Sequence, residues 1–248
     1  MSDKINLNNN TVDYTVAVLK GASGIVPFAG QALGELVAQI PGQRFDRFQA
    51  FLKILDERLK TTEMSLEELR TKFTNEGFFE LYEEACEQAA KTNSEDRRKY
   101  LAGIIAKGLT SEEIEIQESQ HLLRLLGELN DIEILVLRSY WNDLVSDDRE
   151  FRQKYQNIVY PPATDRGSSQ EDFDKAAIHK SYRSHLTSLG LLAPKYKERN
   201  EKMVVMDRKQ LKEKTQKVET NEIAGYKITS LGNLFLYHVE IVNSRYPY

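Results

Sequence analysis

The sequence predicts a mainly α-helical protein in which an N-terminal helical domain precedes a winged-helix (α+β) C-terminal domain with a small β-hairpin. Three observations lead to this fold class. Through most of residues 44–144, apolar residues recur at spacings of three and four, the period of helices with one buried face. A charged helical segment then ends at Gly190, a residue type that commonly stops helices. Residues 225–236 finally follow the pattern of a short strand, an N-cap and a closing helix.

The first domain, expected at residues 1–128, is a series of amphipathic helices in which no segment has the pattern of a strand. Small polar or acidic residues stand where helix starts are expected, because their side chains accept hydrogen bonds from free backbone N–H groups. The predicted helices are residues 44–60, a short helix with a capping box at Ser65 and Glu68, residues 77–90, a helix opened by Ser94 and Asp96 that runs to 109, and one from Thr110 or Ser111 to about 129.

Residues 16–40 form the most apolar stretch of the chain, with Lys20 and Glu35 as their only charges. Twenty-five residues are enough to span a bilayer, and Gly30 and Gly34 have the spacing at which transmembrane helices approach closely. However, four glycines and one proline interrupt the stretch, and Glu35 would be costly in hydrocarbon. We expect a buried core hairpin here, with a membrane-inserting segment as the alternative.

The second domain is expected at residues 129–248. Asn130 and Asp131 cap a predicted helix that reaches residue 144, and residues 151–158 have helical potential. Residues 160–169 are rich in Pro, Gly and Ser, which predicts an exposed loop. This loop is longer than the three or four residues of a compact helix-turn-helix.

The charged third helix of this domain is expected to end at Gly190. Its spacing places Ile178, Tyr182, Leu186 and Leu189 on one apolar face and directs His179, Lys180, Arg183 and Thr187 elsewhere. A wing follows, with an apolar tetrad at residues 203–206. Because residues 210–217 are strongly hydrophilic, we expect a short charged helix there in an unusually long wing.

Residues 175–217 carry twelve Lys or Arg and four Asp or Glu, a net charge of +8 in a chain whose total is −4. A basic segment on an acidic protein is the electrostatic footprint expected for binding phosphate or an acidic protein surface. The alternative is a solvated charged face without a partner.

Eight residues are candidates for nucleic-acid or partner binding. Cationic and hydroxyl side chains on a recognition helix and at the start of a wing suit phosphates and base edges, although winged helices also serve as protein-interaction modules. The candidates are Lys180, Arg183, Ser184 and Thr187 on the helix, and Lys195, Lys197, Arg199 and Lys202 at the start of the wing.

No catalytic or metal-binding motif is present, so we expect no enzymatic activity, no metal and no cofactor. The four histidines are scattered; His179 and His185 share a helix but lie six residues apart, on different faces. The carboxylate clusters lie on polar helix faces, and no P-loop, dinucleotide fingerprint or nucleophile elbow occurs. The single cysteine, Cys86, lies among glutamates that raise a thiol's pKa, which favours a packing residue.

One cysteine cannot form an internal disulfide, and the first ten residues lack the order of a signal peptide. These features predict a cytoplasmic protein of bacterial type. Homo-oligomerisation is compatible with the helical half of the chain.

The order of elements resembles the bacterial abortive-infection alpha family, which combines a helical region with a winged-helix-like end. Three segments carry the resemblance: residues 44–55, an arginine-led amphipathic helix; residues 96–109, with Tyr100, Ala102, Ile104 and Ile105; and residues 186–192 together with 226–235. The resemblance implies phage defence without a known catalytic activity. The predicted function is therefore non-enzymatic defence with a winged helix that binds nucleic acid or protein. The alternatives are a membrane-active effector that inserts residues 16–40 and a winged-helix transcriptional regulator.

Overall fold

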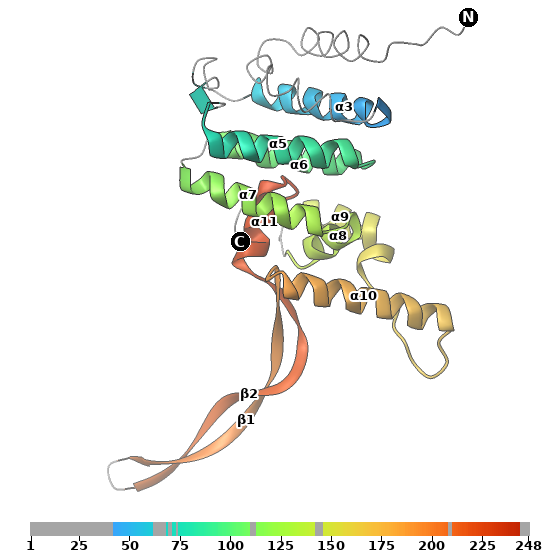
Figure 1. Ribbon diagram of the computed structural model, residues 1–248. Helices are drawn as coiled ribbons and strands as arrows, with labels where there is room; N and C mark the ends of the chain where they lie inside the picture. Colours follow the sequence, from blue (N-terminus) through green and yellow to red (C-terminus); the bar gives the residue numbers. More distant parts are fainter. Residues whose placement is uncertain are drawn as a thin grey trace, which may run out of the picture. The chain divides into compact units, whose positions relative to one another are not determined.

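A computed structural model describes residues 42–61, 68, 71–72, 74–109, 113–141, 146–207 and 210–243, with side chains for all of these except 42–43, 113–115, 146–148, 200–207 and 210–219. The described residues form eight α-helices and one two-stranded antiparallel sheet (Figure 1), which confirms a mainly helical protein with a hairpin near its C-terminus. The expected core hairpin at residues 16–40 and the capping box at Ser65 lie outside the described residues.

The chain divides into two compact units. The N-terminal unit comprises Met1–Asn130 and Phe235–Asn243, and the C-terminal unit comprises Asp131–Leu234 and Ser244–Tyr248. The division after Asn130 lies two residues from the expected boundary at 128, and residues 235–243 belong with the first unit.

Four described helices build the N-terminal unit: α3 (Gly42–Leu59), α5 (Glu76–Lys91), α6 (Glu95–Leu109) and α7 (Glu113–Glu128). The predicted helices at 44–60, 77–90 and 94–109 are thereby confirmed. Helix α3 packs on α5 and α6, and α7 packs on the same two helices. Their apolar stripes meet in a fully buried core that includes Phe48, Phe51, Leu55, Phe78, Leu81, Leu101, Ile104 and Ile105.

Caps and small residues fix how these helices begin and cross. Asn75 accepts a hydrogen bond from the Phe78 backbone N–H (3.0 Å), and Ser94 accepts one from that of Arg97 (3.2 Å), so both helix starts are satisfied. A Cβ on Gly108 would lie 2.9 Å from a methyl group of Leu81, so glycine at this position allows α6 to lie close to α5.

The last described residues of the chain are tied into the N-terminal unit by two basic side chains. Arg58 of α3 forms an ion pair with Glu240, and Lys107 of α6 donates to the Tyr237 carbonyl while its ammonium lies 3.4 Å from the centre of the Tyr237 ring. These contacts explain why residues 235–243 pack with the first unit.

The C-terminal unit contains α8 (Asp131–Ser139), α9 (Ser146–Val159), α10 (Gln170–Ser188), β1 (Leu192–Asp207), β2 (Gln210–Ile228) and the beginning of α11 (Ser230–His238). Helix α8 ends at Ser139, so the prediction that it reaches residue 144 was wrong; Tyr140 and Trp141 already form a turn. The loop at 160–169 is confirmed as irregular and mostly exposed. A reciprocal capping box between Ser169 and Asp172 begins α10.

The predicted end of α10 is confirmed. Gly190 has a φ angle of 73°, and the Leu191 N–H bonds to the Leu186 carbonyl (2.9 Å) while the Gly190 N–H bonds to that of Thr187 (3.0 Å). This pair of bonds is the Schellman motif, which satisfies the last carbonyls of a helix and turns the chain away. The chain therefore passes directly from α10 into β1.

The predicted buried face of α10 was partly wrong. Leu186 is fully buried, but Ile178 is 50% exposed and His179 is only 8% exposed. The apolar residues of α10 are compatible with more than one helical phase, and contact with α8 selects the phase. In the selected phase the His185 Nδ1 atom lies 2.7 Å from a carboxylate oxygen of Glu133.

The expected hairpin is confirmed as one two-stranded antiparallel sheet, whose strands form a ribbon. Strand β1 has 16 residues and β2 has 19, paired from Leu192↔Ile228 to Asp207↔Gln210. Residues 210–217, expected as a charged helix, form part of β2. Lys, Glu and Gln favour helices in isolation, but pairing with the apolar tetrad of β1 overrides this local preference. In Figure 1 the ribbon extends from the end of α10 beyond the helices of its own unit.

Candidate functional site

The candidate residues of α10 fall into two groups. Lys180 and Ser184 are exposed, whereas Arg183 and Thr187 are half-buried. The Thr187 hydroxyl donates to the Arg183 carbonyl within the helix (2.8 Å), so it already has a hydrogen-bond partner. Lys180 and Ser184 are therefore the α10 candidates whose side chains face solvent.

Arg183 belongs to a cluster that holds the ribbon base against the helices of its unit. Its guanidinium lies 5.8 Å from the centre of the Tyr226 ring of β2, and Tyr226 contacts the Tyr140 ring edge-on at 6.5 Å. Burial raises the pKa of the Tyr140 hydroxyl, while the charge of Arg183 and a hydrogen bond from it oppose the rise. A cation that lies over one tyrosine ring and donates to the hydroxyl of another stabilises the fold and has less freedom to reach a ligand.

The wing candidates with described side chains are solvent-exposed. Lys195 pairs with Gly225 across the ribbon, and the Lys197 ammonium lies 2.7 Å from the Glu222 carboxylate. Both members of that ion pair are more than half exposed, so the attraction is small and either charge can exchange its partner. Arg199 is also exposed, and Lys202 occupies the register position opposite Thr215.

Three exposed residues at the ribbon base, Lys227, Tyr196 and Ile223, were not among the predicted binding residues. Lys227 lies opposite Ala193, and Tyr196 lies opposite Ile223 with about half of each side chain exposed. The strand at 225–228 was predicted, but its partners depend on the register, which two irregularities around Tyr196 shift. Register is a property of two distant segments, so no local pattern contained it.

The charges of α10 are segregated along its length. Its first turns carry Glu171, Asp172 and Asp174, and the Lys175 ammonium pairs with Glu171 at 2.5 Å. A helix N-terminus attracts anions, but here carboxylates already occupy it. The cations available to a partner accordingly lie on the C-terminal half of α10 and on the ribbon.

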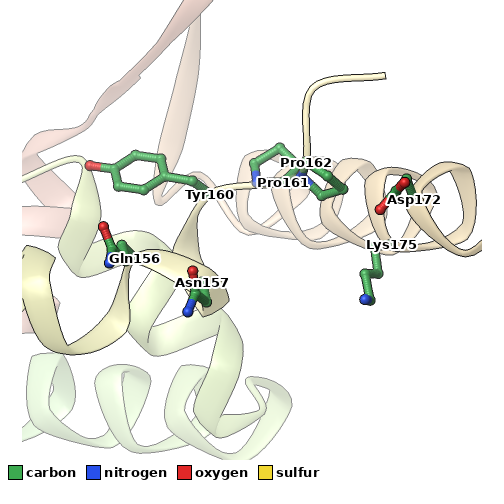
Figure 2. Close-up of a pocket in the computed structure, with 7 residues that line it drawn as sticks. All are labelled: Gln156, Asn157, Tyr160, Pro161, Pro162, Asp172 and Lys175. Atoms are coloured by element: carbon green, nitrogen blue, oxygen red, sulfur yellow. The ribbon is translucent and has the colours of Figure 1, made fainter. Parts of the chain in front are cut away.

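A hollow of about 480 Å³ lies between the end of α9 and the start of α10. Figure 2 shows Tyr160 and Lys175 well apart, with Pro161 and Pro162 between them. Asp172 is engaged in the capping box and Lys175 in its ion pair with Glu171. The residues that line it are Gln156, Asn157, Tyr160, Pro161, Pro162, Asp172 and Lys175, a set without a nucleophile next to a base.

The remaining titratable residues, His179, His185 and Cys86, contact other side chains of the protein or are buried in its core. His179 contacts the Tyr182 ring edge-on at 5.9 Å, and burial lowers its pKa, whereas His185 contacts Glu133, so the two histidines have different partners. Cys86 is completely buried, and burial raises the pKa of its thiol, which confirms a packing residue. The part of the chain that the structure describes contains no group of three metal-ligating side chains.

None of the described helices is both long and apolar enough to cross a bilayer, and the membrane alternative concerned residues 16–40, outside the described ranges. Comparisons of the chain with protein-family models, with curated proteins and with solved structures find no match. The resemblance to the abortive-infection alpha family therefore stays a prediction.

Proposed function

We propose that the chain is a non-enzymatic protein that binds nucleic acid through its C-terminal unit. The observation that carries the proposal is the ribbon formed by β1 and β2: it is long, rich in lysine, and packed against a helix of its unit mainly at its base, on α10. Among its described side chains, Lys195, Lys197 and Arg199 are exposed, and phosphate is a ligand that exposed cations suit.

The order of α8, α9, α10 and the ribbon supports a winged-helix-like module, in which the third helix is followed by a hairpin. The module departs from a compact one in two ways. The chain between α9 and α10 is a loop of about ten residues, and the first turns of α10 are acidic. A recognition helix that enters a groove by its N-terminus would bring carboxylates against phosphate. Binding is accordingly assigned to the C-terminal half of α10 and to the ribbon.

A double charge reversal tests the proposal. Lys180→Glu with Lys195→Glu changes two exposed cations and leaves the Arg183 cluster intact. Lys53→Glu with Arg124→Glu makes the same change of charge at exposed positions of the N-terminal unit, and is the matched control. At 50 mM salt we expect the first variant to bind a labelled 20-bp duplex about tenfold or more weakly, because each phosphate contact contributes through counterion release.

In the same gel-shift or anisotropy assay, the control variant should bind like the wild type. Equal losses in the two variants would mean that net charge alone drives the interaction, and no binding of nucleic acid by the wild type would refute the proposal. In that second case an acidic protein surface becomes the ligand to test, because the same cations suit it.

The sequence resemblance supplies the biological setting of the proposal: phage defence in the bacterial cytoplasm without catalysis. Plaque counts on bacteria that express the wild type or the Lys180→Glu, Lys195→Glu variant test this setting. If binding serves defence, the wild type lowers the plaque count and the variant does not. A transcriptional role would instead appear as changed expression of specific promoters in uninfected cells.

A further inference from the structure

We infer that the ribbon enters the major groove of B-form duplex DNA. This inference rests on the proposed function and names the form of nucleic acid and the groove. It concerns the distal ribbon, defined as the ten consecutive register pairs from Glu198↔Glu219 to Asp207↔Gln210.

The dimensions of the distal ribbon match one turn of the duplex. Ten pairs at roughly 3.3 Å per residue span about 33 Å, close to the 34–36 Å helical repeat of B-DNA. The major groove, about 12 Å wide, admits a two-stranded β-ribbon. The irregularities on both sides of Tyr196 lie where the distal ribbon begins, and such bulges bend a strand and increase its twist. A twisted ribbon can follow a groove that also winds right-handedly.

The distal ribbon carries cations on both strands. Residues 198–219 contain seven Lys or Arg and five Asp or Glu, a net charge of +2. Phosphates line both walls of the groove, so the cations of each strand can contact the phosphates of one wall. A two-stranded ribbon is at best marginally stable alone in water. A duplex that encloses it would therefore order the ribbon as well as bind it.

Two other forms of nucleic acid fit less well. Double-stranded RNA has a deep, narrow major groove that protein elements cannot enter. Proteins that bind single strands usually stack bases on aromatic side chains, and residues 199–217 contain no Phe, Tyr, Trp or His. The B-form duplex is thus the form that the composition and the shape of the ribbon favour.

A variant with a shortened ribbon distinguishes the contribution of the ribbon's shape to DNA binding from the contribution of its charge. Arg199 and Val218 are register partners, so residues 200–217 can be replaced by an Asn-Gly turn without disturbing the pairs below. This deletion removes a net charge of +3. The matched control keeps the ribbon and removes the same charge through Lys202→Gln, Lys212→Gln and Lys214→Gln. Far-UV circular dichroism and thermal unfolding establish that both variants are folded.

Binding is measured by anisotropy at fixed salt with a 20-bp DNA duplex, the same sequence as double-stranded RNA, and single-stranded DNA. The wild type is expected to prefer the DNA duplex by about tenfold or more, by analogy with the selectivity of groove contacts over backbone contacts. Methyl green, a major-groove ligand, should displace it, and the minor-groove ligand distamycin should not. The charge control should bind more weakly and keep the preference, whereas the shortened ribbon should lose it.

Equal affinity for duplex DNA and duplex RNA, displacement by distamycin alone, or an unchanged preference in the shortened variant would overturn the groove inference and leave phosphate binding in place. Absence of binding to all three probes would overturn the proposed function and the groove inference together.

Discussion

The two units differ most clearly in what they leave exposed. Among the described residues, every large hydrophobic side chain with substantial exposure lies in the C-terminal unit: Ile132, Ile158, Tyr160, Phe173, Ile178, Tyr196 and Ile223. In the N-terminal unit the described apolar stripes of α3, α5, α6 and α7 meet in a common core. Exposed apolar residues that lie together often belong to an interaction surface.

Charge follows the same division. The N-terminal unit contains 15 Lys or Arg and 22 Asp or Glu, and the C-terminal unit contains 19 and 16. A net negative charge disfavours nucleic acid, and a net positive charge favours it. The difference in charge therefore supports the proposal that the second unit is the one that binds.

The largest expected effect is on the core of the N-terminal unit. Phe78→Ala removes a fully buried ring of α5 and should lower the free energy of unfolding by about 3–5 kcal/mol. The matched change in the C-terminal unit, Ile178→Ala, affects a half-exposed side chain and should cost less than about 1 kcal/mol. Urea titrations of both variants measure the difference, and similar losses would contradict the contrast between the units.

Two glycines of the C-terminal unit make a second matched pair. A Cβ at Gly232 would collide with the Leu191 carbonyl oxygen, whereas a Cβ at Gly225 meets no atom within 4 Å. Gly232→Ala should therefore destabilise the junction of α10, β1 and α11 by about 1–3 kcal/mol. Gly225→Ala should change the melting temperature of the protein little. If both variants melt like the wild type, the close approach of α11 to Leu191 is wrong.

Alkaline pH should destabilise the N-terminal unit through Cys86. Burial raises the pKa of this thiol, so the folded unit keeps the proton while the unfolded chain releases it near its ordinary pKa. The thiol is neutral in both states below about pH 8.5, and above it stability should fall by about 1.4 kcal/mol per pH unit. Tyr82, whose pKa burial also raises, adds to the loss at higher pH.

Unfolding of the wild type and of Cys86→Ala, followed between pH 7 and 10, measures this slope. The variant should lose less stability per pH unit than the wild type, whatever its stability at pH 7. Parallel curves for the two proteins would show that the thiol ionises equally in the folded and unfolded states.

The smallest effect is expected at the ribbon base. Glu222→Gln removes the exposed ion pair with Lys197 and should change the unfolding free energy by less than about 1 kcal/mol. The same change frees a cation, so affinity for a DNA duplex should rise two- to threefold or more. Weaker binding by the Glu222→Gln variant would argue against Lys197 as a contact.

Local signals were sufficient for much of the fold. Gly190 marked the end of α10 because a left-handed residue terminates a helix whatever surrounds it. The stripe of residues 44–60 predicted α3 because its apolar residues share a single helical face.

Non-local contacts decided what the sequence could not predict. The phase of α10 depends on Glu133, a residue of another helix, so His179 was expected outside and is buried. The length of β2 depends on pairing with β1, so residues 210–217 were expected as a helix. The exposure of Lys180 and Ser184 follows from their positions on α10, but the engagement of Arg183 with Tyr226 required the ribbon register. Residues that bind across elements are those for which sequence periodicity carries least information.

The salt dependence of duplex binding tests most directly whether recognition resides in the C-terminal unit. With a 20-bp DNA and 50–200 mM salt, a logarithmic plot of the binding constant against salt concentration should be linear and steep for the wild type, with a slope smaller by roughly two for Lys180→Glu with Lys195→Glu. The Lys53→Glu, Arg124→Glu variant should retain the wild-type slope. A slope near zero in the wild type, or the same reduction in both variants, would contradict the account.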